Sequence, residues 1–497
     1  MIKYNKVFFT YFYQINKFNF NVRSFFSMPV LYNQEIKLIK SKLPNSWDLA
    51  KMFLKEHPNI KYCMTFDSFY NYNNNMWSVI DIEELKILFL DFLELKFPNN
   101  FQIFKTNISN KIISILELQL DDFSMPDAIK NANKNGFLLP FINGVLNTKT
   151  KEFIFHKSEN FNTFIIPLNY NKEDTIKNTK FEEFLNSIVN YNTVRLQVLR
   201  ACLYLIFTNN LSYQVVLYIY GPTATGKSIL TQILHYLLNK ASYPTPVPIK
   251  RLDSKFYKSA LINKILLILN EISFYKWKEN SLIKDILKQE TIEGKKKYKK
   301  SFMFNPSIFL ILTSEKIWDV NKINLNLYNN IIYFPFDNTN IIKNIDYNLF
   351  DTKGTYGKIA EGKLVPYLSG FINWILNCPK EDLDLIKQGG RKVTEILNPD
   401  LFKDNPLNNF VIDCLIQDKN SYERIGNKDS NFESLYGTYL IWAKYNETNI
   451  INIYKFSKIL LELLKELGWK VIKERINIGI IIKGIKLNKN YLAKLKK

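Results

Sequence analysis

The stretch that decides the fold is YIYGPTATGKSIL, Tyr218–Leu230. Its centre, GPTATGKS (Gly221–Ser228), fits the pattern G-x-x-x-x-G-K-[ST] at every fixed position. The fully apolar run Val215–Tyr220 precedes it and predicts a buried strand. The residues that follow predict a helix, because apolar side chains recur on one face at Ile229, Leu230, Ile233, Leu234, Leu237 and Leu238. Strand, glycine-containing loop and helix in this order predict a phosphate-binding loop.

Such a loop turns backbone N–H groups onto phosphates, and the helix N-terminus adds its positive dipole end. We expect Lys227 to reach the β- and γ-phosphates of ATP and Ser228 to hold Mg²⁺. The competing explanation, a chance glycine-containing turn, is disfavoured by the flanking strand and helix. A GTPase would need N-K-x-D, and NKIN (Asn321–Asn324) lacks the Asp. The predicted ATP-binding residues are Gly221, Pro222, Thr223, Ala224, Thr225, Gly226, Lys227 and Ser228.

Two further apolar runs predict buried strands that end in polar residues. KILLILNEIS (Lys264–Ser273) ends in Asn270 and Glu271. We predict that Glu271 polarises the attacking water and that Asn270 contacts Mg²⁺-bound water, without the charge of the Asp common at this position. In SIFLILTS (Ser307–Ser314), Thr313 or Ser314 is placed to sense the γ-phosphate, and we select Ser314 as the catalytic candidate. An ordinary polar strand end is the alternative for each.

Between these two strands lies the basic stretch LKQETIEGKKKYKKSFMFNP (Leu287–Pro306). A glycine followed by lysines between strand-like runs predicts a β-hairpin with a cationic tip, suited to the backbone of DNA. Composition alone favours a solvated lysine face, but the position between two strands of the nucleotide-binding core favours the hairpin. The predicted DNA-binding residues are Lys295, Lys296, Lys297, Tyr298, Lys299 and Lys300.

The composition describes a globular, basic chain of 497 residues with a formal charge of +21. That charge favours a polyanionic partner, although A/T-rich codons would also enrich lysine over arginine. Four scattered cysteines exclude a CxxC zinc ribbon and a disulfide framework, which predicts a reducing, intracellular compartment. The sequence contains no run of about 18 apolar residues, so we expect no membrane-spanning helix. Residues 1–33 contain no acidic side chain, which is typical of a transit peptide or of an aromatic extension encoded by an A/T-rich genome. We therefore expect the protein to belong to an organelle (plastid or mitochondrion) or to be encoded by a plasmid or a virus.

Four segments follow from these patterns: an extension 1–37, an N-terminal domain 38–190, a P-loop ATPase core 191–397 and a small domain 398–497. In the N-terminal domain, DIEELKILFLDFLELK (Asp81–Lys96) predicts a helix capped by Asp81. Asp81 and Glu83 would also suit a primase metal site, but no third carboxylate accompanies them, and capping is preferred. LPFINGVLNTKTKEFIFH (Leu139–His156) predicts two strand-like runs around a turn.

These motifs together resemble the superfamily three DNA helicases of the poxvirus and phage/plasmid helicase–primase type. GPTATGKS and LLILNE are similar to the first two motifs of that family, the lysine-rich stretch to its basic motif, and FLILTSE and IIYFPF (Ile331–Phe336) to its later strands. PFINGVLNTKTKEF resembles the domain found upstream in the family. LYGTYLIWAKYN, KFSKILLELLKELGW and the wing-like KVIKERINIGIIIKGIKL resemble its winged helix.

The resemblance implies an AAA+-like core, an α+β N-terminal domain and a C-terminal winged helix. It implies an ATP-dependent replicative helicase acting as a homo-hexameric ring on single-stranded and forked DNA, without a membrane partner and with a separate primase. Two departures stand out: Ser314 replaces the family's Asn, and Asn329–Asn330 replace an arginine pair, with Lys316 or Lys322 as candidate substitutes. They favour an alternative, an ATP-switched initiator or loader with little hydrolysis. A degenerate remnant is a third possibility.

Overall fold

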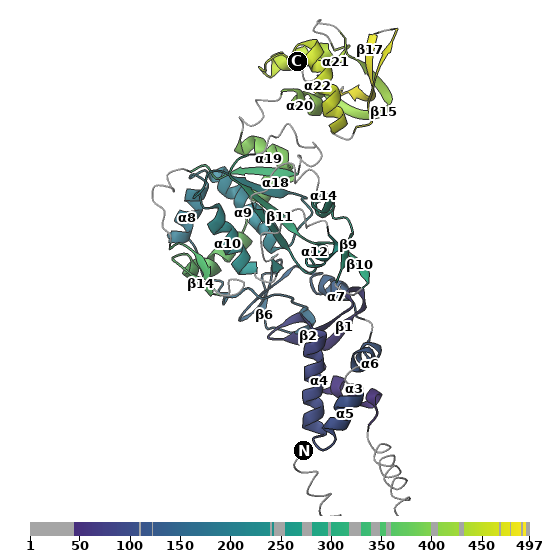
Figure 1. Ribbon diagram of the computed structural model, residues 1–497. Coiled ribbons are helices and arrows are strands. Elements are labelled where there is room, and N and C mark those ends of the chain that lie inside the picture. The colour runs from purple at the N-terminus through teal and green to yellow at the C-terminus, as the bar shows by residue number, and fades with distance from the viewer. Residues whose placement is uncertain are drawn as a thin grey trace, which may run out of the picture. The chain divides into compact units, whose positions relative to one another are not determined.

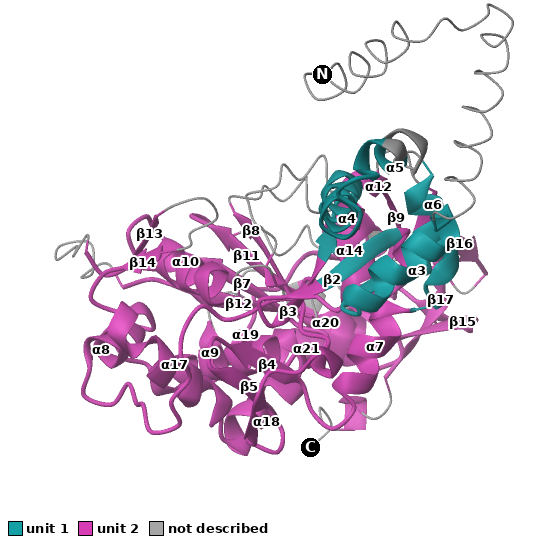
Figure 2. Ribbon diagram, turned by 90° about the horizontal axis from the view of Figure 1, so that it is seen from below, with its two compact units in different colours: residues 1–64, 68–71, 79–123 teal, residues 65–67, 72–78, 124–497 magenta. Residues whose placement is uncertain are grey.

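The computed structural model describes most of the chain beyond residue 43 (Figure 1). Its residues divide into two compact units, shown in Figure 2: residues 1–64, 68–71 and 79–123, and residues 65–67, 72–78 and 124–497. The described residues are 44–108, 111–121, 123–238, 241–242, 254–270, 281–296, 300–317, 330–338, 348–353, 359–398, 406–426, 432–466, 469–477, 479–488 and 491–493.

The first unit is mainly helical. Its helices are α3 (Ser46–Glu56), α4 (Ile82–Lys96), α5 (Phe101–Ile108) and α6 (Ile112–Gln119), and β1 (Ile60–Cys63) pairs antiparallel with residues 68–71 of β2 (Ser68–Asn73). Phe53 packs edge to face against Phe89 and Phe92 in its core. The predicted helix α4 is confirmed with Asp81 at its N-cap, although the Asp81 side chain makes no capping hydrogen bond. Glu83 pairs with Lys86 on the helix surface.

A four-stranded parallel sheet forms the centre of the second unit, in the order β12-β7-β11-β8. The strands are β7 (Val216–Tyr220), β8 (Leu266–Asn270), β11 (Phe309–Ser314) and β12 (Ile331–Pro335). All four coincide with predicted apolar runs, which is expected because parallel sheets are covered on both faces. A parallel bridge between Ser242 and Leu266 continues the pairing beyond β8. The α/β class is thereby confirmed.

Helices cover one face of this sheet and its open edge at β12. Leu217, Ile219 and Ile311 share one core with α10 (Lys227–Leu238), α9 (Thr193–Phe207) and α17 (Leu368–Leu376). Alternate residues point to the other face, where Tyr218 and Tyr333 meet edge to face at 5.1 Å between ring centroids. Helix α19 (Gly390–Leu397) lies along the open edge at β12, because the Thr394 hydroxyl accepts a hydrogen bond from the Tyr333 N–H.

Residues 124–190 pack into the same core as the sheet. They form α7 (Met125–Ala132), the antiparallel strands β4 (Leu138–Phe141), β5 (Gly144–Asn147) and β6 (Phe153–Ile154), and α8 (Lys180–Ile188). The predicted pair of strands is thus present with a third strand added. Phe141, Leu146 and Phe184 belong to the sheet's own core cluster, so the packing shows no break at residue 190.

Residues 406–493 form α20 (Pro406–Cys414), β15 (Leu415–Arg424), α21 (Leu435–Tyr445), α22 (Ile453–Glu466), β16 (Ile472–Ile476) and β17 (Gly479–Leu487). The sheet order is β15-β17-β16, and β16 with β17 is the predicted hairpin. Phe410, Tyr439 and Phe456 pack together in the core. Of the basic hairpin residues, Lys483 pairs with Glu474 and Lys486 with Asp418.

The remaining elements connect these parts. They are β3 (Met76–Ile80), α12 (Lys255–Ser259), α14 (Ser281–Lys288), β9 (Ile292–Lys295), β10 (Ser301–Phe304), β13 (Asp351–Lys353), β14 (Ile359–Glu361), α18 (Lys380–Lys387) and the short 3₁₀ turns Met64–Phe66, Ser158–Asn160 and Val365–Tyr367.

Candidate functional site

The loop 221–226 joins the carboxyl end of β7 to the first turn of α10. Gly221 opens it with φ +151°, and a Cβ there would lie 2.0 Å from the Phe336 carbonyl oxygen. That oxygen belongs to the backbone that follows β12, so it cannot move aside as a side chain could. Position 221 therefore requires glycine, and the path of the loop is fixed by the edge strand beside it.

Lys227 is buried at the start of α10, with 8 % of its surface exposed. Its ammonium donates to the Gly221 carbonyl at 2.7 Å and also to the Pro222 carbonyl. The Thr225 hydroxyl donates to the same Pro222 carbonyl at 2.9 Å. These bonds hold a positive charge against the loop, where an anion at the helix N-terminus would meet it. The neighbouring Ser228 is exposed.

Asn270 and Thr313 meet at the same edge of the sheet. The Thr313 hydroxyl donates to Asn270 Oδ1 at 2.9 Å, and the two residues are paired in register on β11 and β8. Thr313 points to the same face of β11 as Phe309 and Ile311, because alternate residues of a strand share a face. The side chains of Phe309 and Ile311 pack with α10. Both polar ends therefore face the side of the sheet that carries the loop's helix.

Ser314 points to the opposite face. Its hydroxyl lies 2.7 Å from the Tyr218 hydroxyl, and both hydroxyls reach the Lys316 carbonyl oxygen. Of the two residues considered from the sequence, Thr313 is thus better placed than Ser314 to respond to a group held at the loop. A sensing role for either residue stays a prediction.

The basic stretch forms the predicted hairpin. Strands β9 and β10 are antiparallel, with Lys295 opposite Ser301, so Lys296 and Lys300 flank its tip. Lys255 pairs with Glu293 at 2.7 Å, and this bond lowers the pKa of the Glu293 carboxyl. Phe302 packs edge to face against Phe66. Several predicted residues lie outside the described part of the chain, and their roles stay predictions: Glu271, Lys297, Tyr298, Lys299, Lys322 and Asn329.

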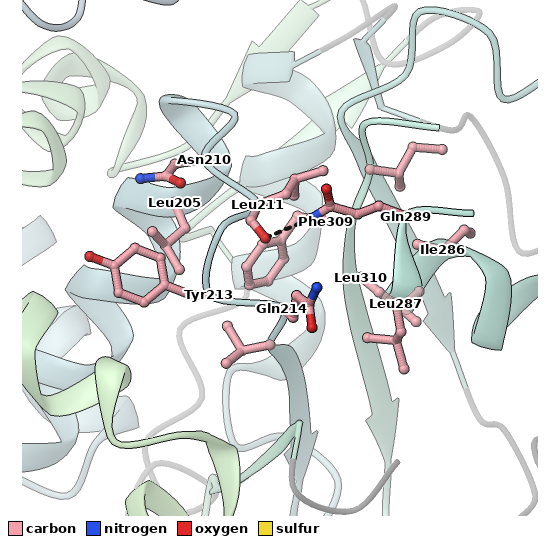
Figure 3. A pocket seen from close by; sticks show the side chains of 12 residues that line it. Leu205, Asn210, Leu211, Tyr213, Gln214, Ile286, Leu287, Gln289, Phe309 and Leu310 are labelled. Carbon is pink, nitrogen blue, oxygen red and sulfur yellow. Dashed lines mark hydrogen bonds between the residues drawn. The ribbon is translucent and has the colours of Figure 1, made fainter. Parts of the chain in front are cut away.

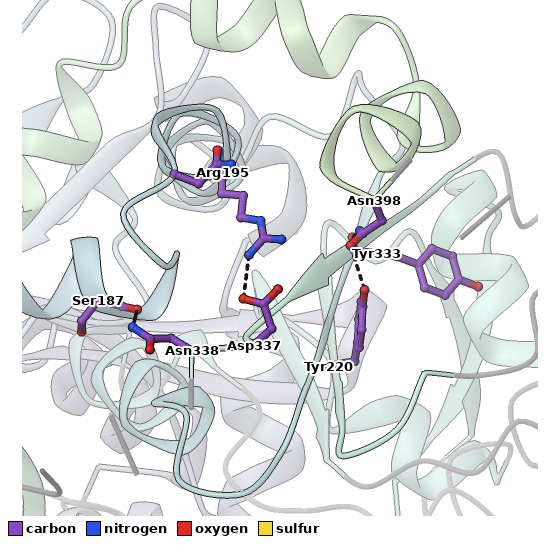
Figure 4. A network of polar contacts seen from close by, with 8 residues as sticks. Ser187, Arg195, Tyr220, Tyr333, Asp337, Asn338 and Asn398 are labelled. Carbon is purple, nitrogen blue, oxygen red and sulfur yellow. Dashed lines mark hydrogen bonds and ion pairs between the residues drawn. The ribbon is translucent and has the colours of Figure 1, made fainter. Parts of the chain in front are cut away.

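A polar network beside the loop was not singled out from the sequence (Figure 4). Arg195, in the first turn of α9, pairs with Asp337 at 2.7 Å, and the Asn338 amide donates to the Ser187 carbonyl at 2.8 Å. The Tyr220 hydroxyl donates to Asn398 Oδ1 at 2.9 Å, and burial raises the pKa of Tyr220 to about 12. The network ties α8, α9 and the end of α19 to the residues flanking the loop. Its members are far apart in sequence, so no local pattern marks it.

Asn330, where the resemblance leads one to expect arginine, lies at the amino end of β12. Its carbonyl accepts from the Val216 N–H at 2.8 Å. Gly390 packs against the backbone of Asn330, and the next residue is Arg391. The Arg391 guanidinium donates to Glu395 at 2.9 Å and to Asn409 at 2.7 Å, and its side chain is 12 % exposed. The arginine that the fold brings to this position is thus held by its own chain.

A small cavity lies at the other end of the central strands (Figure 3). It is lined by Val215, which directly precedes β7, and by Phe309, the first residue of β11. Beside it, the Gln289 amide donates to the Leu211 carbonyl at 2.8 Å. Its volume of about 20 Å³ is close to that of a single water site. The cavity is therefore too small for a nucleotide, and it lies at the amino edge of the sheet, away from the loop.

Among the described residues, no group of three or more His, Cys, Asp or Glu side chains is arranged to hold a metal ion. Within the same ranges, no helix has the length and apolar character that crossing a membrane requires.

Comparison with known proteins adds two family matches. Residues 50–190 match the family described as "D5 N terminal like", and residues 219–324 match the "Family of unknown function (DUF5906)". The first covers the helical unit and the strands β4 to β6, and the second covers the loop, β8, the hairpin and β11. A search of curated proteins gives no match. The chain therefore carries a D5 N-terminal-like region followed by the region that contains the loop.

The solved structures that match this chain include two of one protein. The "A form apo structure of NrS-1 C terminal region-CTR" is 14 % identical, with a TM-score of 0.45, over 89 % of this chain and 99 % of that one. The "apo structure of NrS-1 C terminal region (305-718)" is 13 % identical, with a TM-score of 0.45, over 90 % of this chain and 100 % of that one. Similarity of this degree says nothing about what the present chain does.

Proposed function

We propose that this protein is an ATP-dependent DNA helicase of a replication system, working as a ring, with an initiator or loader as the alternative. The observation that carries the proposal is the register of the parallel sheet, in which Tyr220 pairs with Ser314 and Thr313 with Asn270. The carboxyl ends of parallel strands form the edge where α/β proteins bind ligands. The loop 221–228 and the amide of Asn270 therefore share one edge.

The residues at this edge suit a nucleoside triphosphate. Lys227 would exchange its two carbonyl partners for β- and γ-phosphate oxygens, and the exposed Ser228 hydroxyl would hold Mg²⁺ together with a water on Asn270. Bound there, Mg²⁺ would neutralise charge on the phosphates. Glu271 follows Asn270 directly in the chain and is the proposed base for the attacking water. Thr313 replaces Ser314 as the favoured sensor, because it contacts Asn270.

The cationic hairpin supplies the contact with DNA in this proposal. In the chain it lies between α14, which follows β8, and the start of β11, and both β8 and β11 reach the nucleotide edge. We infer that movement at this edge moves the hairpin, which grips one strand through Lys295, Lys296 and Lys300 and through the lysines at its tip. The hexamer, the AAA+-like assembly with ATP between subunits, the winged helix of residues 406–493 and the separate primase belong to the same proposal.

The initiator or loader alternative has its own support. Asn270 places no charge beside the metal position, and the arginine next to Asn330 is engaged by Glu395 and Asn409. An arginine finger raises turnover by about 10³- to 10⁵-fold in related phosphoryl-transfer enzymes, so a protein without one would bind ATP and hydrolyse it slowly.

An ATPase assay with and without single-stranded DNA separates the two. The helicase predicts turnover that rises with DNA and collapses in Lys227→Ala, together with unwinding of a forked substrate. The loader predicts ATP-dependent DNA binding with little turnover. Failure of wild-type protein to bind ATP at all would reject both.

A further inference from the structure

A cavity of about 1110 Å³ lies beside the root of the cationic hairpin, within the second unit. Its walls come from α7 and the turn after it, from residues 160–164, from residues 261–265 and from residues 303–307 at the end of β10. Small-molecule sites typically measure about 300–1,000 Å³. The volume is thus large enough for a segment of a polymer. We call this site the amide cavity.

Three amide side chains on the wall have buried atoms without a hydrogen-bond partner: Asn160 Nδ2, Asn162 Nδ2 and Asn209 Oδ1. Asn162 is the most enclosed, with 5 % of its surface exposed. Native proteins satisfy nearly all buried polar atoms, because leaving one unpaired destabilises the fold. These atoms lie buried beneath the cavity wall, and a turn of their side chains into the cavity would present two donors and one acceptor. That set is the complement of a nucleobase edge, which presents carbonyl oxygens and amino groups.

The charge of the wall favours the same ligand. Lys130, Lys134 and Lys264 line the cavity, and Asp127 is the one acidic residue among its lining residues. Lys130 and Lys134 are exposed, and no ion pair of either is found among the described residues. Such a surface attracts the phosphates of a nucleic acid backbone.

An aromatic residue on the wall adopts a costly backbone conformation. Phe161 has φ +48°, the left-handed region that bulky residues rarely enter, and its ring stacks on Trp77 at 5.8 Å between centroids. Strained residues of this kind gather at ligand sites. Aromatic rings set among basic side chains are the usual platform for the bases of single-stranded nucleic acid.

We propose that the amide cavity binds a short segment of single-stranded DNA, with phosphates against Lys130 and Lys134 and bases against the amides of Asn160, Asn162 and Asn209. The inference extends the proposed function, from which it takes only that the polymer is DNA. Strand β10 leads from the hairpin into residues 303–307 of the wall, so one strand of the fold connects the two DNA sites. Binding here does not require ATP.

The charge contacts are tested by the salt dependence of binding. Anisotropy of labelled oligo(dT) is measured with the full chain, without nucleotide, over a range of salt concentrations. In Lys130→Ala/Lys134→Ala, the slope of log affinity against log salt should fall by about 1.4, because each phosphate contact on a single strand contributes about 0.7. The matched control, Lys380→Ala/Lys392→Ala, removes the same charge from exposed positions on α18 and α19 and should keep the slope.

The amide contact is tested by Asn162→Leu. The affinity for oligo(dT) should fall roughly tenfold, because a base contact is lost. The melting temperature of the free protein should stay the same or rise, because an unpaired buried amide is removed. A purely structural role of Asn162 predicts the reverse, a lower melting temperature and unchanged affinity.

Two further results would overturn the proposal. One is a lysine double variant whose slope equals that of the control. The other is displacement of oligo(dT) by thymidine monophosphate at equal nucleotide concentration, which would assign the cavity to free nucleotides. Basal ATP turnover is measured on the same preparations. Its absence from wild-type protein would reject the helicase and leave the cavity result standing.

Discussion

At the phosphate loop, Lys227 is 8 % exposed and donates to two carbonyls of its own loop, whereas in the amide cavity Asn162 is 5 % exposed and its amide nitrogen has no partner. Both are buried polar groups beside a proposed ligand. The loop keeps its charge satisfied and must exchange bonds to take a phosphate. The cavity leaves its amide donors unpaired beneath its wall. We infer that a ligand at the loop replaces bonds that the protein already makes, whereas a ligand in the cavity supplies partners that the protein does not provide.

The largest expected effect comes from Lys227→Ala, which separates the two sites. Loss of the ammonium should lower ATP turnover about 100-fold or more, as removal of a charge-stabilising donor does in other enzymes. Binding of oligo(dT) without nucleotide should not change. Steady-state turnover and anisotropy measure the two quantities, with Lys380→Ala as the control for loss of one lysine charge. A parallel loss of DNA binding would show that the sites are not independent.

Gly221→Ala should break the loop through its backbone. The added Cβ would lie 2.0 Å from the Phe336 oxygen at a φ of +151°, and we expect the free energy of unfolding to fall by about 3 kcal/mol. Denaturant titration measures this. Gly479→Ala is the matched control, because Gly479 also has a positive φ but its nearest neighbour is Arg424 Cδ at 3.9 Å. Equal losses in both variants would attribute the effect to φ alone.

A smaller effect is expected when the pH is lowered, and it should reduce the stability of the region around the phosphate loop. His235 lies in α10 near the Ser242 hydroxyl, and burial lowers the pKa of His235 to about 4. The unfolded chain binds this proton below about pH 6.5 while the folded protein does not, so stability should decline as pH falls from 6.5 toward 4. By pH 5 the loss should be about 1–2 kcal/mol.

His235→Gln should flatten this dependence. Thermal unfolding of both proteins between pH 7.5 and pH 5 gives the comparison, and DNA binding to the amide cavity provides the control on the other region. A variant that loses stability with the same slope as wild-type protein would assign the decline to other groups.

The region around the phosphate loop could be predicted from the sequence because the patterns that mark it are contiguous. The apolar runs and the GPTATGKS motif place β7, α10, β8, β11 and β12, and the glycine before a lysine run places the hairpin. Choosing between Thr313 and Ser314 required knowing which face carries α10, and that depends on packing. Arg195 and Asp337 stand 142 positions apart, so their pairing has no local signature.

The amide cavity could not be predicted for the same reason. Its lining residues run from Thr65 to Ser307, and asparagine is abundant throughout the chain. Nothing in the sequence distinguishes Asn162 from an asparagine in an ordinary turn. Only its burial without a partner does so.

The measurement that tests the central claim most directly is an electron cryomicroscopy structure of the full chain with a non-hydrolysable ATP analogue, Mg²⁺ and forked DNA. We predict that the Lys227 ammonium leaves the carbonyls of Gly221 and Pro222 for the β- and γ-phosphates, with Asn270 and Thr313 facing them. A nucleotide bound elsewhere, with Lys227 still on its own loop, would contradict the account.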